Sequence, residues 1–203
     1  MLKLMRFFLL TVFIFNLSFA STTILDKFEK KLQNYKSFKA NIVEELQLKE
    51  FEDNEKYYGS IIINSNGEVL YRFTKPEKMF IYIDKRGYVY GYSYEDDEIY
   101  KQKLSSNEFY LKLFRRFLSK KSINDLFKSI KEEKRKNGYR LILLPKDKKI
   151  KKVYMDLDKN LNIKDVIVIT KDGKAIYRFS NIKYSKHLEP VPYDVKKILK
   201  RIK

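Results

Sequence analysis

Residues 57–104 set the architecture of this chain, and they read YYGSIIINSNGEVLYRFTKPEKMFIYIDKRGYVYGYSYEDDEIYKQKL. Short runs of β-branched and aromatic residues alternate there with turn sequences such as Asn64–Gly67 and Lys75–Glu77. Asn and Gly accept a positive φ and Pro presets φ, whereas the runs between them favour strands. The stretch therefore predicts four or five short strands that form an antiparallel meander.

Aromatic side chains are unusually dense on this meander. Alternate residues of a strand share a face of the sheet. The residues that share a face within their own strands are Val69, Tyr71 and Phe73 in one strand and Tyr88, Tyr90, Tyr92 and Tyr94 in another. A sheet with so much aromatic surface must cover it or use it, and we expect one face to line an apolar pocket.

The first twenty residues, Met1–Ala20, have the features of a secretory signal peptide. Lys3 and Arg6 precede the apolar run Phe7–Phe15, and the small residues Ser18 and Ala20 stand at positions −3 and −1 of a cleavage site. The alternative is an uncleaved membrane anchor, but the apolar run is shorter than the roughly 20 residues that span a bilayer. We expect cleavage after Ala20 and a mature protein in the periplasm.

Composition predicts one domain, residues 21–203, because no linker, low-complexity tract or clear repeat interrupts the chain. The chain has no cysteine, so it forms no disulfide and has no cysteine for lipid attachment. The formal net charge is +18, or +16 without Lys3 and Arg6. Such a surface favours anionic partners, although an AT-rich genome also enriches Lys, Ile, Tyr and Phe.

The order of elements predicts an α+β fold. Thr22 and Thr23 precede a helix with apolar residues at helical spacing, and a long alternating strand follows. The remaining expected elements are an amphipathic helix at 109–118, a short helix at 123–131, strands at 139–144, 152–157, 163–170 and 174–184, and a basic helix at 193–203. About ten antiparallel strands with inserted helices indicate one strongly curved sheet whose concave side is covered by helices.

Several motifs, in order along nearly the whole mature chain, resemble the outer-membrane lipoprotein carrier family, the LolA-like periplasmic chaperones. The segments concerned are Tyr35–Ala40, Gly59–Ile61, Leu70–Pro76, Asp84–Gly87, Val89–Tyr92, Leu144–Lys146, Leu157–Ile163 and Tyr177–Ile182. Each motif alone is mostly strand and turn chemistry, and their order makes the resemblance moderately specific.

The resemblance implies an unclosed β-barrel of about eleven strands with a helical lid over an apolar cavity. It also implies a monomeric chaperone that receives acylated lipoproteins from an inner-membrane ABC transporter and passes them to an outer-membrane receptor. Ser65 occupies the position where the family commonly has a basic residue that holds the lid closed. The C-terminus is also unusually basic for the family.

Strand alternation and the resemblance together indicate a candidate site. The expected cavity wall is Val69, Tyr71, Phe73, Tyr90 and Tyr92, and the expected underside of the lid is Phe109, Leu113, Phe114 and Phe117. The alternative for each residue is an ordinary core without a ligand. We expect the lid to bury its own rings when the cavity is empty, so that the lid competes with the cargo.

Basic residues of the last helix, Lys196, Lys197, Lys200 and Arg201, are candidates for docking on an anionic membrane or an acidic receptor. A solvated charged face is the other interpretation. Arg115, Arg116, Lys120 and Lys121 form a second basic group after the lid.

No catalytic or cofactor motif is present, and we expect a non-enzymatic protein. His187 is the one histidine and has no nucleophile pattern around it, which is typical of a surface turn. Asp156–Asn160 resembles the start of a calcium loop, but Leu161 and Ile167 stand where such a loop has Gly and Glu. Tyr71–Phe73 superficially resembles a nucleic-acid-binding strand, which the secretion signal argues against. An envelope sensor or a binder of anionic lipid or polysaccharide with the carrier fold remains the alternative function.

Overall fold

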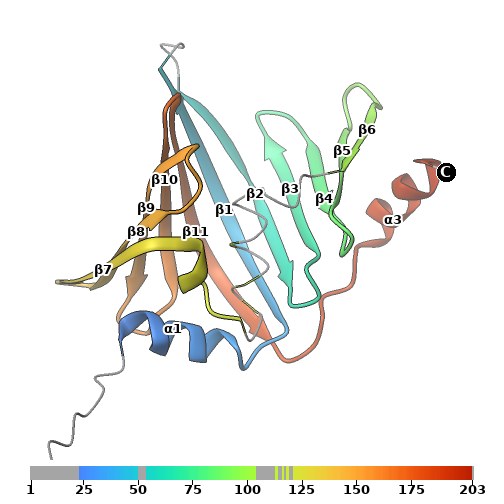
Figure 1. Cartoon of the computed structure of the whole chain (residues 1–203). Coiled ribbons are helices and arrows are strands. Elements are labelled where there is room, and N and C mark those ends of the chain that lie inside the picture. The colour runs from blue at the N-terminus through green and yellow to red at the C-terminus, as the bar shows by residue number, and fades with distance from the viewer. Residues whose placement is uncertain are drawn as a thin grey trace, which may run out of the picture.

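The structure is a computed structural model that describes residues 23–49, 54–103, 113, 116, 118 and 121–202. Within these residues, eleven antiparallel strands form one curved, unclosed sheet in the order β6-β5-β4-β3-β2-β1-β11-β10-β9-β8-β7 (Figure 1). The strands are β1 (Ser37–Leu48), β2 (Glu55–Asn64), β3 (Val69–Lys75), β4 (Met79–Ile83), β5 (Tyr88–Ser93), β6 (Ile99–Lys103), β7 (Phe127–Arg135), β8 (Gly138–Pro145), β9 (Ile150–Asp158), β10 (Ile163–Thr170) and β11 (Gly173–Ser185). The expected signal peptide lies outside the described residues.

The long central strand β1 joins the two halves of the sheet, because it pairs with β2 on one side and with β11 on the other. Phe38, Ala40 and Ile42 of β1 point to one face, which we call the inner face, and the opposite face is the outer face. All three side chains are buried in one large apolar cluster that extends over both halves of the sheet.

Helix α1 (Ile24–Leu32) packs on the inner face through Leu25, Phe28 and Leu32, which are all buried. Its start is fixed by a capping box, in which the Thr23 hydroxyl accepts from the Asp26 amide and the Asp26 carboxylate accepts from the Thr23 amide. The Glu132 carboxylate of β7 accepts from the first two helical amides at 3.0 and 2.9 Å. This contact ties the helix to the far edge strand and brings a negative charge to the positive end of the helix.

The turns of the meander determine which side chains share a face. Asn64 stands opposite Glu68 and Asp84 opposite Tyr88, so each turn contains three residues, with Gly67 and Gly87 at φ 91° and 93°. A three-residue turn pairs odd-numbered residues with odd-numbered ones and even with even. Leu70, Tyr82 and Tyr90 therefore form one row across the outer face, as do Arg72, Phe80 and Tyr92.

A C-terminal helix, α3 (Tyr193–Leu199), covers these outer rows and continues into the 3₁₀ turn η2 (Lys200–Ile202). Its buried residues Val195 and Ile198 pack against the outer-face cluster of Leu70, Phe80, Tyr82, Tyr90 and Tyr92. Arg72 pairs with Asp194 at 2.7 Å, and Arg201 forms a two-pronged ion pair with Asp97 at 2.7 and 3.0 Å. The predicted basic helix is thus present, and it is attached to the sheet at both ends.

The structure corrects the predicted short helix at 123–131. Only Asn124–Leu126 is helical, as the 3₁₀ turn η1, and Phe127–Arg135 forms the edge strand β7. The strand forms because it pairs with β8 through the two-residue turn Lys136-Asn137, and pairing in a sheet outweighs a weak local helical pattern. Residues 132–135, beyond the predicted helix, also belong to this strand.

The predicted lid helix lies mostly outside the described residues. Leu113 and Arg116 have helical backbone, and Leu118 follows in a turn. No helix of the described part of the chain is both long enough and apolar enough to cross a membrane.

We predict that Val195→Asp releases α3 from the outer face. Val195 is fully buried, and burying a charged carboxylate without a partner costs more than the helix gains from its two surface ion pairs. Limited proteolysis should then cleave the C-terminal segment faster, and an apolar dye should bind the uncovered aromatic rows. Lys196→Asp, at the exposed neighbouring position, is the control and should leave both measurements near wild type.

Candidate functional site

The inner face is covered by apolar residues from the segment that follows β6. Leu113, Leu118 and Ile123 are 2%, 5% and 0% exposed, and all three belong to the inner-face cluster. We call these three residues the cover, and α1 packs on the same face beside them. The cover therefore packs against the same surface that the sequence predicts as the binding face.

One small void lies beneath the described residues of the cover. A void of about 10 Å³, room for about one water molecule, lies between Leu32, Phe38, Ile63, Leu118, Ile163, Val166 and Phe179. Every lining side chain is apolar, so the void is unsuited to water. The described residues of the cover thus pack on the face where the sequence predicts the cavity.

Three of the five predicted wall residues lie on the inner face. Val69 is buried in the inner cluster and Tyr71 packs against it. Phe73 is buried beside Tyr71, with their rings stacked at 6.0 Å between centroids, and Tyr57 meets Phe73 edge-on at 5.6 Å. These rings form an aromatic surface toward one end of the inner face.

The predicted placement of Tyr90 and Tyr92 beside these residues is wrong. The three-residue turns put both tyrosines in the outer-face rows, where α3 covers them. The Tyr92 hydroxyl donates to Asp97 of the β5–β6 turn at 2.6 Å. The inner-face positions on β5 are Val89 and Gly91 instead.

Of the predicted lid residues, Leu113 is buried in the inner cluster. Phe109, Phe114 and Phe117 lie outside the described residues. Their placement under the cover therefore stays a prediction.

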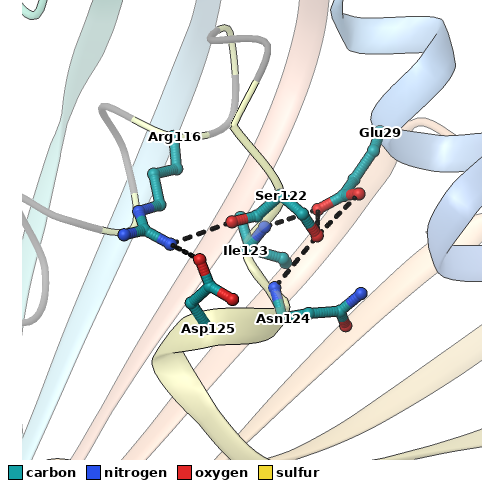
Figure 2. A network of polar contacts seen from close by, with 6 residues as sticks. All are labelled: Glu29, Arg116, Ser122, Ile123, Asn124 and Asp125. Carbon is teal, nitrogen blue, oxygen red and sulfur yellow. Dashed lines mark hydrogen bonds and ion pairs between the residues drawn. The ribbon is translucent and has the colours of Figure 1, made fainter.

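A polar network fixes the end of the cover to α1 (Figure 2). The Glu29 carboxylate of α1 accepts from the Ile123 amide at 2.6 Å and from the Ser122 hydroxyl at 3.0 and 3.1 Å. Arg116 donates to the Ser122 carbonyl at 2.9 Å and approaches Asp125 at 3.3 Å. These bonds join the cover to the helix beside it.

This network supplies an attachment that sequence reasoning missed. The family resemblance directed attention to position 65, where Ser65 stands, whereas the cover is held by an acidic residue on α1. The sequence contains only a weak signal of it, because Glu29 lies on the polar side of an amphipathic helix and has many possible partners.

One ionisable side chain, Glu44, points to the inner face among aromatic residues. It follows Phe38, Ala40 and Ile42 in the alternation of β1 and stands opposite Tyr57 and Tyr177. Burial raises the pKa of the Glu44 carboxyl, and a hydrogen bond with Tyr177 offsets part of that effect. The alternation predicted for this strand thus holds at Glu44. The predicted cavity wall did not include this carboxyl group.

The predicted docking residues divide into two groups. Lys196, Lys197 and Lys200 are exposed on the solvent side of α3. Arg201 is instead paired with Asp97 and attaches the chain end to the β5–β6 turn, so its role is structural.

Among the described residues, no group of three His, Cys, Asp or Glu side chains is placed to hold a metal ion. His187 lies exposed in the segment after β11, where its carbonyl accepts from the Ser37 hydroxyl at 2.8 Å.

Comparison with known families agrees with this geometry. The family model for the outer membrane lipoprotein carrier protein LolA matches residues 33–193, which includes every strand of the sheet. This chain belongs to the LolA family. No curated protein matches it in sequence.

Solved structures similar to this LolA-family chain are distant in sequence. A putative outer membrane lipoprotein-sorting protein domain from Vibrio parahaemolyticus is 13% identical, with a TM-score of 0.46 over 88% of this chain and 96% of that one. A LolA superfamily protein from Nitrosomonas europaea is 12% identical, with a TM-score of 0.41 over 84% and 94%. The MucA/MucB complex of Pseudomonas aeruginosa gives 10% identity and a TM-score of 0.44 over 84% and 58%.

We predict that Glu29→Gln loosens the cover. A hydrogen bond to a charged group contributes about 1.5–3 kcal/mol, and Gln removes the charge while it keeps the size. Hydrogen exchange at the Ile123 amide should become faster. Glu95→Gln, at an exposed turn position, is the matched control, and unchanged exchange in Glu29→Gln would show that the network does not hold the cover.

We also predict a pH-dependent effect of Glu44→Gln. Because the folded-state pKa of Glu44 is raised, its contribution to stability is favourable below the unfolded-state pKa of about 4.3 and is lost as pH rises through the folded-state pKa. The variant should therefore be more stable than wild type at pH 7, and the gain should shrink as the pH falls toward 4. Thermal unfolding at several pH values measures this, with Glu98→Gln as control. A variant that is less stable at pH 7 than wild type would contradict the assignment.

Proposed function

We propose that this LolA-family protein binds the acyl chains of lipoproteins on its inner face and carries them across the periplasm from the inner to the outer membrane. The observation that supports it most is the cover: apolar residues of a separate segment fill an otherwise apolar, concave surface, and a small polar network attaches them to α1. An ordinary core needs no such arrangement. In this proposal the cover occupies the site when cargo is absent.

The energetics suit reversible exchange between cover and cargo. Burying one methylene contributes about 0.8 kcal/mol, so ten methylenes contribute about 8 kcal/mol. Exposing Leu113 and Leu118 costs about 3–6 kcal/mol at 1.5–3 kcal/mol for each side chain. The small difference allows cargo to bind without becoming trapped, which a carrier requires.

The large rings at one end of the inner face support the same proposal. Tyr71 and Phe73 are flat, and Tyr71 is only partly buried, so a flexible hydrocarbon chain has aromatic surface to contact when the cover moves. Delivery by an inner-membrane ABC transporter and release to an outer-membrane receptor are parts of this proposal. No catalytic role is proposed for any residue.

We predict that Tyr71→Glu abolishes binding of a fluorescent fatty acid while the protein still folds. The new carboxylate would have to be buried beneath the hydrocarbon chain, which costs several kcal/mol. Tyr58→Glu is the matched control, because Tyr58 is 44% exposed and stands opposite Val43 on the outer face. Equal binding by both variants would remove Tyr71 from the site.

Cargo identity is accessible by mass spectrometry of what co-purifies from the periplasm. The expected result is acylated peptides or lipoproteins with wild type and their loss with Tyr71→Glu. Co-purification of unacylated protein or of polysaccharide alone would argue against the proposed function.

A further inference from the structure

A second pocket lies on the outer face, separate from the covered inner face. It is open, has a volume of about 470 Å³, and is lined by Glu68, Tyr82, Asp84, Lys85, Arg86, Tyr90, Lys101 and Leu199. The residues come from the turns before β3 and after β4, which lie at the same end of that pair, from β4, β5 and β6, and from the end of α3. The proposed function does not use this pocket.

Positive groups gather beside one ring at this pocket. The Arg86 guanidinium and the Lys101 and Lys103 ammonium groups lie 5.2, 5.2 and 5.7 Å from the centroid of the Tyr88 ring. Lys101 also lies 5.7 Å from the centroid of the Tyr90 ring. Cation–π attraction holds each group near the aromatic surface, but the three charges repel one another over distances of about one Debye length or less. An anion between them would relieve that repulsion.

The two carboxylates that line the pocket are each held by neighbouring donors. Asp84 pairs with Arg86 at 2.9 Å and also accepts from the amides of Arg86 and Tyr88. Glu68 accepts from the Tyr82 hydroxyl at 2.9 Å. Within the described part of the chain, Lys85, Lys101 and Lys103 form no ion pair. The pocket therefore presents positive charge that these carboxylates do not cancel.

The positive surface continues onto α3. Leu199 lines the pocket, and Lys196, Lys197 and Lys200 are exposed on the same helix. Glu95, Asp96 and Glu98 are exposed too, but they lie in the turn at the opposite end of the β5–β6 hairpin. The pocket thus lies at the end of the β5–β6 hairpin away from these three carboxylates.

We propose that this pocket binds the phosphate of an anionic phospholipid headgroup and docks the outer face on an anionic membrane. Among the residues that the structure describes, Lys196, Lys197 and Lys200 also form no ion pair, which brings the number of such lysines on this surface to six. An array of six lysines fits many phosphates better than a single small anion, which favours a bilayer over a free phosphate. The partly exposed Leu199 at the lip meets the apolar boundary beneath the headgroups. When the outer face is docked in this way, the inner face and its cover lie on the opposite side of the sheet.

The test is flotation of the purified protein with lipid vesicles. Wild type should bind vesicles that contain phosphatidylglycerol, should not bind vesicles of phosphatidylcholine alone, and should dissociate as salt rises. The triple variant Lys85→Gln, Lys101→Gln, Lys103→Gln should bind about a hundredfold more weakly, since each basic residue near an anionic surface changes binding about fivefold.

A matched triple variant removes the same charge elsewhere. Lys146, Lys148 and Lys149 are exposed in the β8–β9 turn, in the half of the sheet that ends at the other edge. Their replacement by Gln should change vesicle binding only a few-fold. Equal loss in both triple variants would reduce the effect to net charge and overturn the pocket assignment.

Two further outcomes also overturn the proposal. Absence of wild-type binding to phosphatidylglycerol vesicles would exclude membrane docking and leave an acidic protein as the partner to seek. Displacement from vesicles by inorganic phosphate at constant ionic strength would indicate a site for a free anion. Tyr71→Glu should dock as wild type does, so failure of docking and failure of acyl-chain binding are distinguishable.

Discussion

The alternation of side chains across the paired strands is the constraint on which the rest of this structure depends. A shift of one residue in the register of a strand moves all its side chains to the opposite face. The turns Ser65–Gly67 and Lys85–Gly87 each contain three residues, and this length sends the tyrosines of β5 outward and leaves Val89 and Gly91 inward. The two faces can then serve different partners, because neither contributes rings to the other.

The outer face also differs between the two halves of the sheet. On the meander it is aromatic and covered by α3. On the C-terminal half it bears paired charges: Arg140 binds Asp156 with two hydrogen bonds of 2.6 Å, and Arg178 binds Glu45 at 2.9 Å. Charged pairs suit a face that stays in water, whereas aromatic rows need a covering element. The C-terminal helix therefore has a structural purpose besides its exposed lysines.

Much of this fold was accessible from the sequence, because each strand of the meander is bounded by recognisable turn residues and α1 by a capping sequence. The family could also be inferred, since loose motifs such as Gly59–Ile61 and Leu70–Pro76 occur in the right order. Two errors have physical causes. The helix predicted at 123–131 relied on local spacing and overlooked the turn-forming residues Asn137 and Gly138, which mark the end of a strand. To place Tyr90 and Tyr92 on the correct face, the length of the turn before their strand had to be known. Gly at the third position of the turn Lys85–Gly87 indicates that length.

The candidate site was less accessible because it depends on contacts between distant segments. Glu29 and Ile123 are 94 residues apart in sequence, and nothing local marks either as a partner. The same holds for Arg201 and Asp97, which turn an apparently free basic tail into an attached one. Where a sequence has this many lysines, the informative observation is which of them lack a carboxylate partner, and only the fold provides it. A net charge of +18 does not show where the charge lies on the protein. The paired and unpaired charged side chains of one face do show where that face is positive.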